Sequence, residues 1–183
     1  GHGIGPALSV TSVRAMLRLG LRLSDKLDQL FTHVNNQLTD DLPPNRFVTA
    51  LLGVLDVKQH RIEYQAAGQG PLLHYQAVTR QCVWHAANTI PWGIMDDVPL
   101  DEPIIALLAP GDMWVLLTDG FYEAQNPAGD QLGKERIGEL IDELRDRPAQ
   151  EIVDALVREV DTFAAGEPQG DDLTALVIRR LDS

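Results

Sequence analysis

The chain has 183 residues, 44% of them hydrophobic, and a single cysteine. This composition fits one domain with a buried core and excludes an intramolecular disulfide and a cysteine-based zinc site. The formal net charge of −12 argues against nucleic-acid binding, which needs a basic face, and no apolar run approaches the ~20 residues of a membrane span.

Two helices are predicted at the start of the chain. Gly5-Pro6 is typical of a helix start, because proline in the first turn loses no hydrogen bond, and this helix is expected to end near Leu23. Ser24 is the predicted N-cap of a second helix. Its apolar residues follow helical spacing at Leu27, Leu30, Phe31, Val34 and Leu38. Two prolines within residues 40–45 predict its end.

Short strands, two further helices and a last strand are predicted next. Residues 47–56 and 61–67 are expected to form a hairpin, and Cys82 is expected to be a half-buried strand residue. The other predicted strands are 72–75, 78–84, 104–108, 114–117 and, after helices around 137–144 and 152–163, 173–179. Runs of strands alternate here with pairs of helices. The prediction is therefore an α+β fold, a layered sandwich of mainly antiparallel sheets flanked by helix pairs, with residues 1–183 as one domain.

Two acidic side chains stand at predicted strand ends. Asp119, in Thr118-Asp119-Gly120, follows the strand 114–117, and Asp171 lies just before the strand 173–179. Carboxylates held at a sheet rim suit hard cations such as Mg²⁺ and Mn²⁺, which can activate water and clamp a phosphate. The alternative is ordinary turn chemistry, because Asp and Gly are common in turns. The histidines at 33, 60, 74 and 85 have no metal-ligand spacing.

Several short segments carry a family resemblance, and their order spans nearly the whole chain. They are Gly1-His2-Gly3, Asn35 with Leu38, Phe47-Val48-Thr49-Ala50, Ala67-Gly68-Gln69-Gly70-Pro71, Pro91-Trp92-Gly93, Pro110-Gly111-Asp112, Thr118-Asp119-Gly120 with Glu123-Ala124, and Gly170-Asp171-Asp172-Leu173-Thr174. In this order they resemble the PPM-type metal-dependent protein serine/threonine phosphatases, in the SpoIIE-like bacterial branch. The resemblance implies a PPM phosphatase-like fold.

The resemblance also implies roles for particular residues. Asp119 would be a metal ligand, and Asp171 a second ligand to the same ion, which would be Mn²⁺ or Mg²⁺ in a two-metal site. The nucleophile would be a metal-bound water, so no catalytic side chain is expected. Asp172 would support the site rather than bind the ion. His2 is interpreted as a loop residue before the first helix.

The chain departs from the family pattern at two places. The family's bridging Asp, in D-V-x-G-H-G, would precede Gly1, as would an acid of the first strand. We therefore expect an N-terminally truncated domain that lacks the first strands, holds an incomplete metal site and has little activity alone. Gln69 and Gly70 replace the His and the first Pro of the A-G-H-P-P loop.

The resulting functional hypothesis is a cytoplasmic phosphatase output domain. It would hydrolyse phosphoserine or phosphothreonine on a bacterial signalling protein, such as an anti-sigma-factor antagonist, downstream of a sensor or receiver domain in the same chain. One alternative is a catalytically inactive, phosphatase-like adaptor or docking domain in a response regulator. Another is a structural domain that dimerises through the helix pair 134–165.

Overall fold

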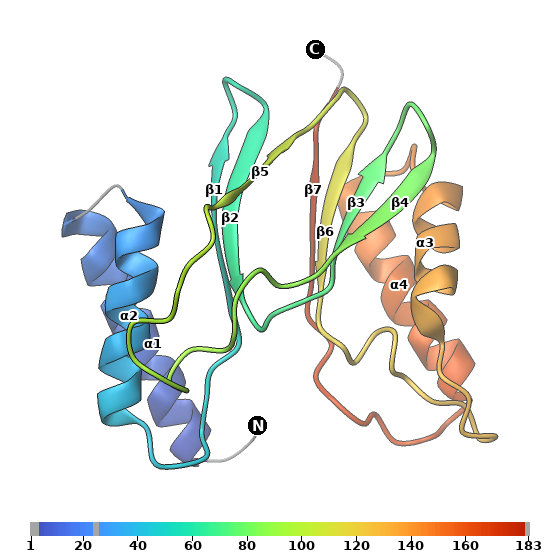
Figure 1. Cartoon of the computed structure of the whole chain (residues 1–183). Coiled ribbons are helices and arrows are strands. Elements are labelled where there is room, and N and C mark those ends of the chain that lie inside the picture. The colour runs from blue at the N-terminus through green and yellow to red at the C-terminus, as the bar shows by residue number, and fades with distance from the viewer. Residues whose placement is uncertain (1–3, 24–25, 182–183) are drawn as a thin grey trace. The chain divides into compact units, whose positions relative to one another are not determined.

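The structure is a computed structural model that describes residues 4–23 and 26–181, so the interpretations of His2 and Ser24 lie outside the described residues. The chain forms two compact units. The first comprises the chain up to Gln69 together with Ala87–Leu107, and the second comprises Gly70–Ala86 together with the chain from Leu108 onward. Figure 1 labels the elements of both units.

The first unit contains two helices and a three-stranded antiparallel sheet. The helices are α1 (Ile4–Leu23) and α2 (Leu27–Asp41), and the strands β1 (Ala50–Asp56), β2 (Arg61–Ala67) and β5 (Ile104–Leu107) follow the order β1-β2-β5. The β1–β2 hairpin closes on the pair Asp56 and Arg61. The Asp56 carboxylate caps its turn by accepting the backbone N–H groups of Lys58 and Gln59, each at 3.0 Å.

Several family-like motifs meet in the core of the first unit. The Asn35 side chain, 3% exposed, accepts the N–H of Gly93 at 3.1 Å and donates to the carbonyl of Met95 at 2.9 Å. The Trp92 ring packs edge-on against Phe31, with centroids 4.7 Å apart. These motif residues hold residues 91–95 against α2. Their role is therefore structural and consists of packing and hydrogen bonding.

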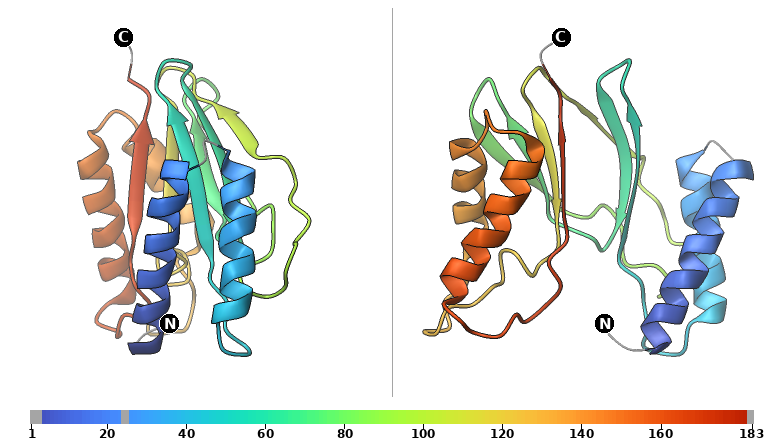
Figure 2. Two further views of the ribbon diagram at one scale, coloured as in Figure 1. Left: turned by 90° about the vertical axis from the view of Figure 1, so that its left-hand side faces the viewer. Right: turned by 180° about the vertical axis from the view of Figure 1, so that it is seen from behind.

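The second unit contains a four-stranded antiparallel sheet and the helices α3 (Gly133–Glu143) and α4 (Ala149–Ala164). The strands β3 (Leu72–Gln76), β4 (Gln81–His85), β6 (Met113–Leu117) and β7 (Ala175–Arg179) follow the order β4-β3-β6-β7. Within this unit both helices cover the same face of the sheet, as Figure 2 shows. Residues of that face and of the helices form one buried cluster, which includes Leu73, Tyr75, Met113, Val115, Phe121, Ile137, Ile141, Ile152 and Leu156.

The predicted α+β class with antiparallel sheets and helix pairs is confirmed, and every predicted helix and strand has a counterpart. Some boundaries were wrong. The strand expected at 78–84 begins only at Gln81, because Val78 lies in a turn, 85% exposed. Residues 47–49 contribute only a bridge between Val48 and Trp92. Cys82 is half-buried in β4 as predicted, and burial raises the pKa of its thiol to about 11.

None of the described helices has both the length and the hydrophobicity that a bilayer-spanning helix requires.

A buried carboxylate connects three segments of the second unit. Asp112, 4% exposed, accepts the N–H groups of Ala77 at 2.8 Å and Ala109 at 2.9 Å. The Nε2 atom of His74 lies 3.2 Å from its Oδ2 atom, and the His74 ring stacks on Trp114. Burial lowers the pKa of the neighbouring His85, and the charge of His74 adds to this effect. Because residues 74 and 112 are far apart in the sequence, no local sequence pattern predicts the contact between His74 and Asp112.

Removing the Asp112 carboxylate should destabilise the fold. Asp112→Ala leaves two backbone donors and His74 without their acceptor in a buried site, which should cost about 2–4 kcal/mol of unfolding free energy. Urea unfolding followed by circular dichroism measures this. Asp146→Ala is the matched control, because the Asp146 side chain is 81% exposed and only loosely paired. Equal stabilities of the two variants would contradict the prediction.

A second carboxylate, Asp142 of α3, should make stability depend on pH in acid. It accepts hydrogen bonds from Arg80 at 2.6 and 3.0 Å and from the Tyr75 hydroxyl at 2.8 Å. The hydrogen bonds from Arg80, more than any other contact, hold the pKa of Asp142 at about 2, below its ordinary 3.8. The lowered pKa means that its stabilising contribution is complete above pH 3.8 and is lost as the pH falls toward 2. Urea unfolding between pH 2 and 5 should therefore show a shallower acid loss for Asp142→Asn than for the wild type; identical slopes would refute this.

Candidate functional site

Asp119 lies in a tight turn at the end of β6. Its backbone carbonyl accepts the N–H of Glu123 at 2.9 Å, and its Oδ1 atom accepts the N–H of Gly120 at 3.1 Å. Phe121, fully buried in the core of the second unit, anchors the turn, and its N–H donates to the carbonyl of Thr118 at 3.2 Å. The turn therefore holds the Asp119 backbone firmly while the side chain stays exposed to solvent.

Asp171 lies in the loop that leads into β7. Its Oδ1 atom accepts the N–H of Asp172 at 2.7 Å, and its carbonyl accepts the side-chain amide of Gln169 at 2.7 Å. Like Asp119, it is exposed. In both carboxylates one oxygen therefore accepts a local N–H group, and the other oxygen has no hydrogen-bond or ion-pair partner among the described residues.

Thr118 joins the two acidic loops. Its hydroxyl donates to the carbonyl of Asp172 at 2.7 Å and accepts the N–H of Thr174 at 2.9 Å. Its backbone N–H also donates to the Thr174 carbonyl at 3.1 Å. These bonds extend the β6–β7 ladder, whose last pair is Leu117 and Ala175. The two acidic loops are therefore fixed side by side at the same end of the sheet.

Gly120 is required by the close approach of these loops. A Cβ atom at this position would lie 2.8 Å from the carbonyl oxygen of Asp172 and 3.3 Å from that of Asp171. Both neighbours are backbone atoms, so they could give way only if the loop moved. Glycine is therefore needed at this position because the two loops approach closely, and not because of an unusual backbone conformation.

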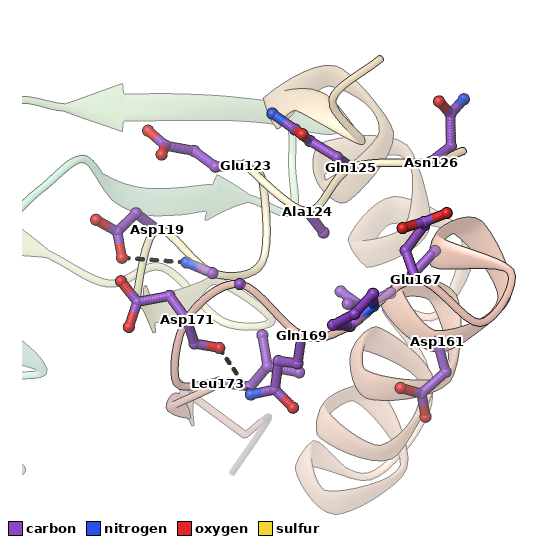
Figure 3. A pocket seen from close by; sticks show the side chains of 15 residues that line it. Asp119, Glu123, Ala124, Gln125, Asn126, Asp161, Glu167, Gln169, Asp171 and Leu173 are labelled. Atoms are coloured by element: carbon purple, nitrogen blue, oxygen red, sulfur yellow. Dashed lines mark hydrogen bonds between the residues drawn. The ribbon is translucent and has the colours of Figure 1, made fainter. Parts of the chain in front are cut away.

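The two carboxylates point toward the same side, as Figure 3 shows. They form part of the wall of a pocket of about 400 Å³, which also includes Glu123, Asp161 and Glu167. No lysine or arginine is among the described residues that line it. A pocket with this lining attracts cations and repels free anions, so a phosphate group could bind there only with a cation.

The donor set fits a hard divalent cation in part. Carboxylate oxygens are the ligands that Mg²⁺ and Mn²⁺ prefer, and Asp119 and Asp171 present them from adjoining loops. Within the described residues, however, no group of three or more His, Cys, Asp or Glu side chains could hold a metal ion. The two sequence-predicted site residues are brought together, and these residues alone supply an incomplete coordination shell.

Tyr122 is a residue of this region that the sequence analysis missed. It is 7% exposed, and its hydroxyl donates to the carbonyl of Gly70 at 3.3 Å. It thereby connects the Asp119 turn to the loop in which Gln69 and Gly70 depart from the family pattern. Burial raises the pKa of Tyr122, and the charges of Asp119 and Glu123 raise it further. Only its place three residues after Asp119 could have drawn attention to it.

Comparisons with known proteins agree with this architecture. The family model for stage II sporulation protein E (SpoIIE) matches residues 1–181. Phosphoserine phosphatase RsbP of Bacillus subtilis is 26% identical over 127 residues, which are 67% of this chain and 31% of RsbP. The chain therefore spans about a third of the length of that relative.

Solved structures share the fold. The SiaA-PP2C domain of Pseudomonas aeruginosa matches 98% of this chain and 72% of its own length, with a TM-score of 0.79 and 21% identity. The manganese-presoaked phosphatase domain of SpoIIE from Bacillus subtilis matches 93% of this chain and 74% of its own length, with a TM-score of 0.62 and 18% identity.

The family match over residues 1–181 and the shared fold agree with the order of the motifs along the chain. The chain belongs to the SpoIIE family of bacterial PP2C-type phosphatase domains, a family of metal-dependent serine/threonine phosphatases.

Proposed function

We propose that this domain hydrolyses phosphoserine or phosphothreonine on a bacterial signalling protein, with Asp119 and Asp171 as ligands of a Mn²⁺ or Mg²⁺ ion. The observation that carries the proposal is the Thr118 linkage, which holds the two acidic loops side by side in one pocket wall. A bound ion supplies an activated water and neutralises the phosphoryl oxygens. The ligand set is expected to be completed by acids that the family resemblance places before Gly1.

The residues of this chain orient the two proposed ligands. The N–H groups of Gly120 and Asp172 each engage one carboxylate oxygen, which limits rotation of Asp119 and Asp171. The pocket beyond them leaves room for residues that flank the phosphorylated side chain. Because its lining is acidic, a phosphate not paired with a cation is repelled, which favours hydrolysis only when the metal is present.

The partners are proposed from the family resemblance, with support from one relative. RsbP is named a phosphoserine phosphatase, which supports a phosphorylated regulatory protein, such as an anti-sigma-factor antagonist, as the substrate. A sensor or receiver domain in the same chain would supply the signal, and a cytoplasmic stress or sporulation response would be the setting. The manganese used for the SpoIIE structure supports the choice of ion.

A second candidate is an inactive adaptor. The substitutions Gln69 and Gly70, and the lack of a third clustered ligand among the described residues, favour it. Dimerisation through α3 and α4 has less support. Their apolar residues are used within the second unit, and Arg136 pairs there with Glu139, Glu143 and Glu159.

Metal binding should depend on both acidic loops. Calorimetric titration of Mn²⁺ into the wild-type chain should show weak binding, and Asp119→Ala and Asp171→Ala should each weaken it more than about tenfold, because each removes a charged oxygen ligand. Asp154→Ala, on the outer part of α4, is the matched control and should bind as the wild type does. Binding that survives both site substitutions would place the ion elsewhere and contradict the proposal.

The Gly120 contact supplies an independent test. Gly120→Ala should push the Asp171–Asp172 loop away from the Asp119 turn, lower stability by about 1–3 kcal/mol, and weaken Mn²⁺ binding. Gly170→Ala is the matched control in the same pocket, because a Cβ there meets nothing within 4 Å. Thermal unfolding and the same calorimetric titration measure both effects. Equal behaviour of the two variants would show that the interloop distance does not matter.

A further inference from the structure

Lys134 lies between two aromatic rings of the second unit. It is half-buried near the start of α3, and its Nζ atom lies 5.3 Å from the ring centre of Tyr122 and 5.9 Å from that of Trp84. The two rings themselves meet edge to face, with centroids 6.3 Å apart. Within the described part of the chain, no carboxylate lies within ion-pair distance of this ammonium group.

The positive charge of Lys134 lies in the first turn of α3, where it interacts unfavourably with the helix dipole. The N-terminus of a helix carries a partial positive charge, so a lysine in the first turn is disfavoured. The π faces of Trp84 and Tyr122 offer a compensating attraction, which at a half-buried site is worth about a three- to tenfold change in an equilibrium. The ammonium group is thus held by the rings, and the rings are held by it.

Tyr122 transmits this restraint to the acidic turn. Its carbonyl accepts the N–H of Gly133 at 2.9 Å, next to Lys134, and its hydroxyl donates to Gly70. The following residue, Glu123, donates its N–H to the carbonyl of Asp119. A shift of Tyr122 would therefore disturb the turn that presents the Asp119 carboxylate.

We propose that Lys134 is a positioning residue for Asp119, acting through the Trp84–Lys134–Tyr122 contact. It touches neither the proposed ion nor the phosphate. Its positive charge fixes Tyr122 and thereby the backbone of residues 119–123. This inference rests on the proposed function only for its consequence, which is tighter metal binding; the structural restraint can be measured without metal.

The experiment separates the charge of Lys134 from its packing. Lys134→Met keeps the apolar stem and removes the ammonium group, whereas Lys134→Arg keeps a cation that can lie over both rings. Lys58→Met, in the exposed β1–β2 turn of the first unit, is the matched control. Amide hydrogen exchange on the metal-free chains is read at Glu123 and Gly133, the donors to Asp119 and Tyr122.

Exchange at these two amides is expected to be about three- to tenfold faster in Lys134→Met, with the amides of β7 unchanged. Lys134→Arg and Lys58→Met should exchange as the wild type does. Unchanged exchange in Lys134→Met, or an increase at every amide, would overturn the inference.

Mn²⁺ titration of the same variants tests the consequence for the site. Lys134→Met should raise the dissociation constant about three- to tenfold, and Lys134→Arg should restore it. A wild-type chain that binds no Mn²⁺ would count against the proposed function, while the exchange data would still decide the role of Lys134. Normal metal binding in Lys134→Met would overturn the link from Tyr122 to Asp119.

Discussion

The hydroxyl group of Thr118 joins two loops that are about fifty residues apart in the sequence. It donates to Asp172 and accepts from Thr174, so the turn after β6 and the loop before β7 are held together where the two strands end. An antiparallel neighbour brings the start of one strand beside the end of the other. The site therefore depends on β6 and β7 being adjacent, and Thr118 converts that adjacency into a fixed arrangement of carboxylates.

The family-like segments of the chain have two kinds of role. Asn35, Trp92 and Gly93 stabilise the first unit through a buried amide and an aromatic contact. Asp112 organises loops of the second unit by accepting backbone N–H groups. Among the described family-like segments, those around Asp119 and Asp171 contribute exposed carboxylates to the wall of the pocket. Most of these motifs therefore indicate the family and stabilise the fold. The two motifs with exposed carboxylates are the candidates for binding a ligand.

The acidic residues of the second unit differ in whether a basic side chain pairs with them. Acidic residues predominate in the second half of the chain, yet those on α3 and α4 are partly neutralised by Arg136 and Arg80. The pocket at Asp119 and Asp171 has no such neutralisation from the described residues that line it. Mutual repulsion among its carboxylates is relieved when a cation enters. This repulsion is the electrostatic reason for proposing a divalent ion at the two adjoining aspartates.

The amino-acid sequence by itself determined the helices, most strands, the α+β class and both acidic positions, because hydrophobic period and turn chemistry are local properties. The predicted strands were too long at residues 47–49 and 78–80, because turn geometry and exposure there outweighed the apolar composition on which the prediction was based. Only the tertiary structure decided that β6 and β7 are neighbours, that Gly120 must lack a side chain, that His74 pairs with Asp112, and that Lys134 lies over Tyr122. These are contacts between distant segments, and their geometry depends on how the strands are ordered in the sheet, which no local pattern of residues specifies.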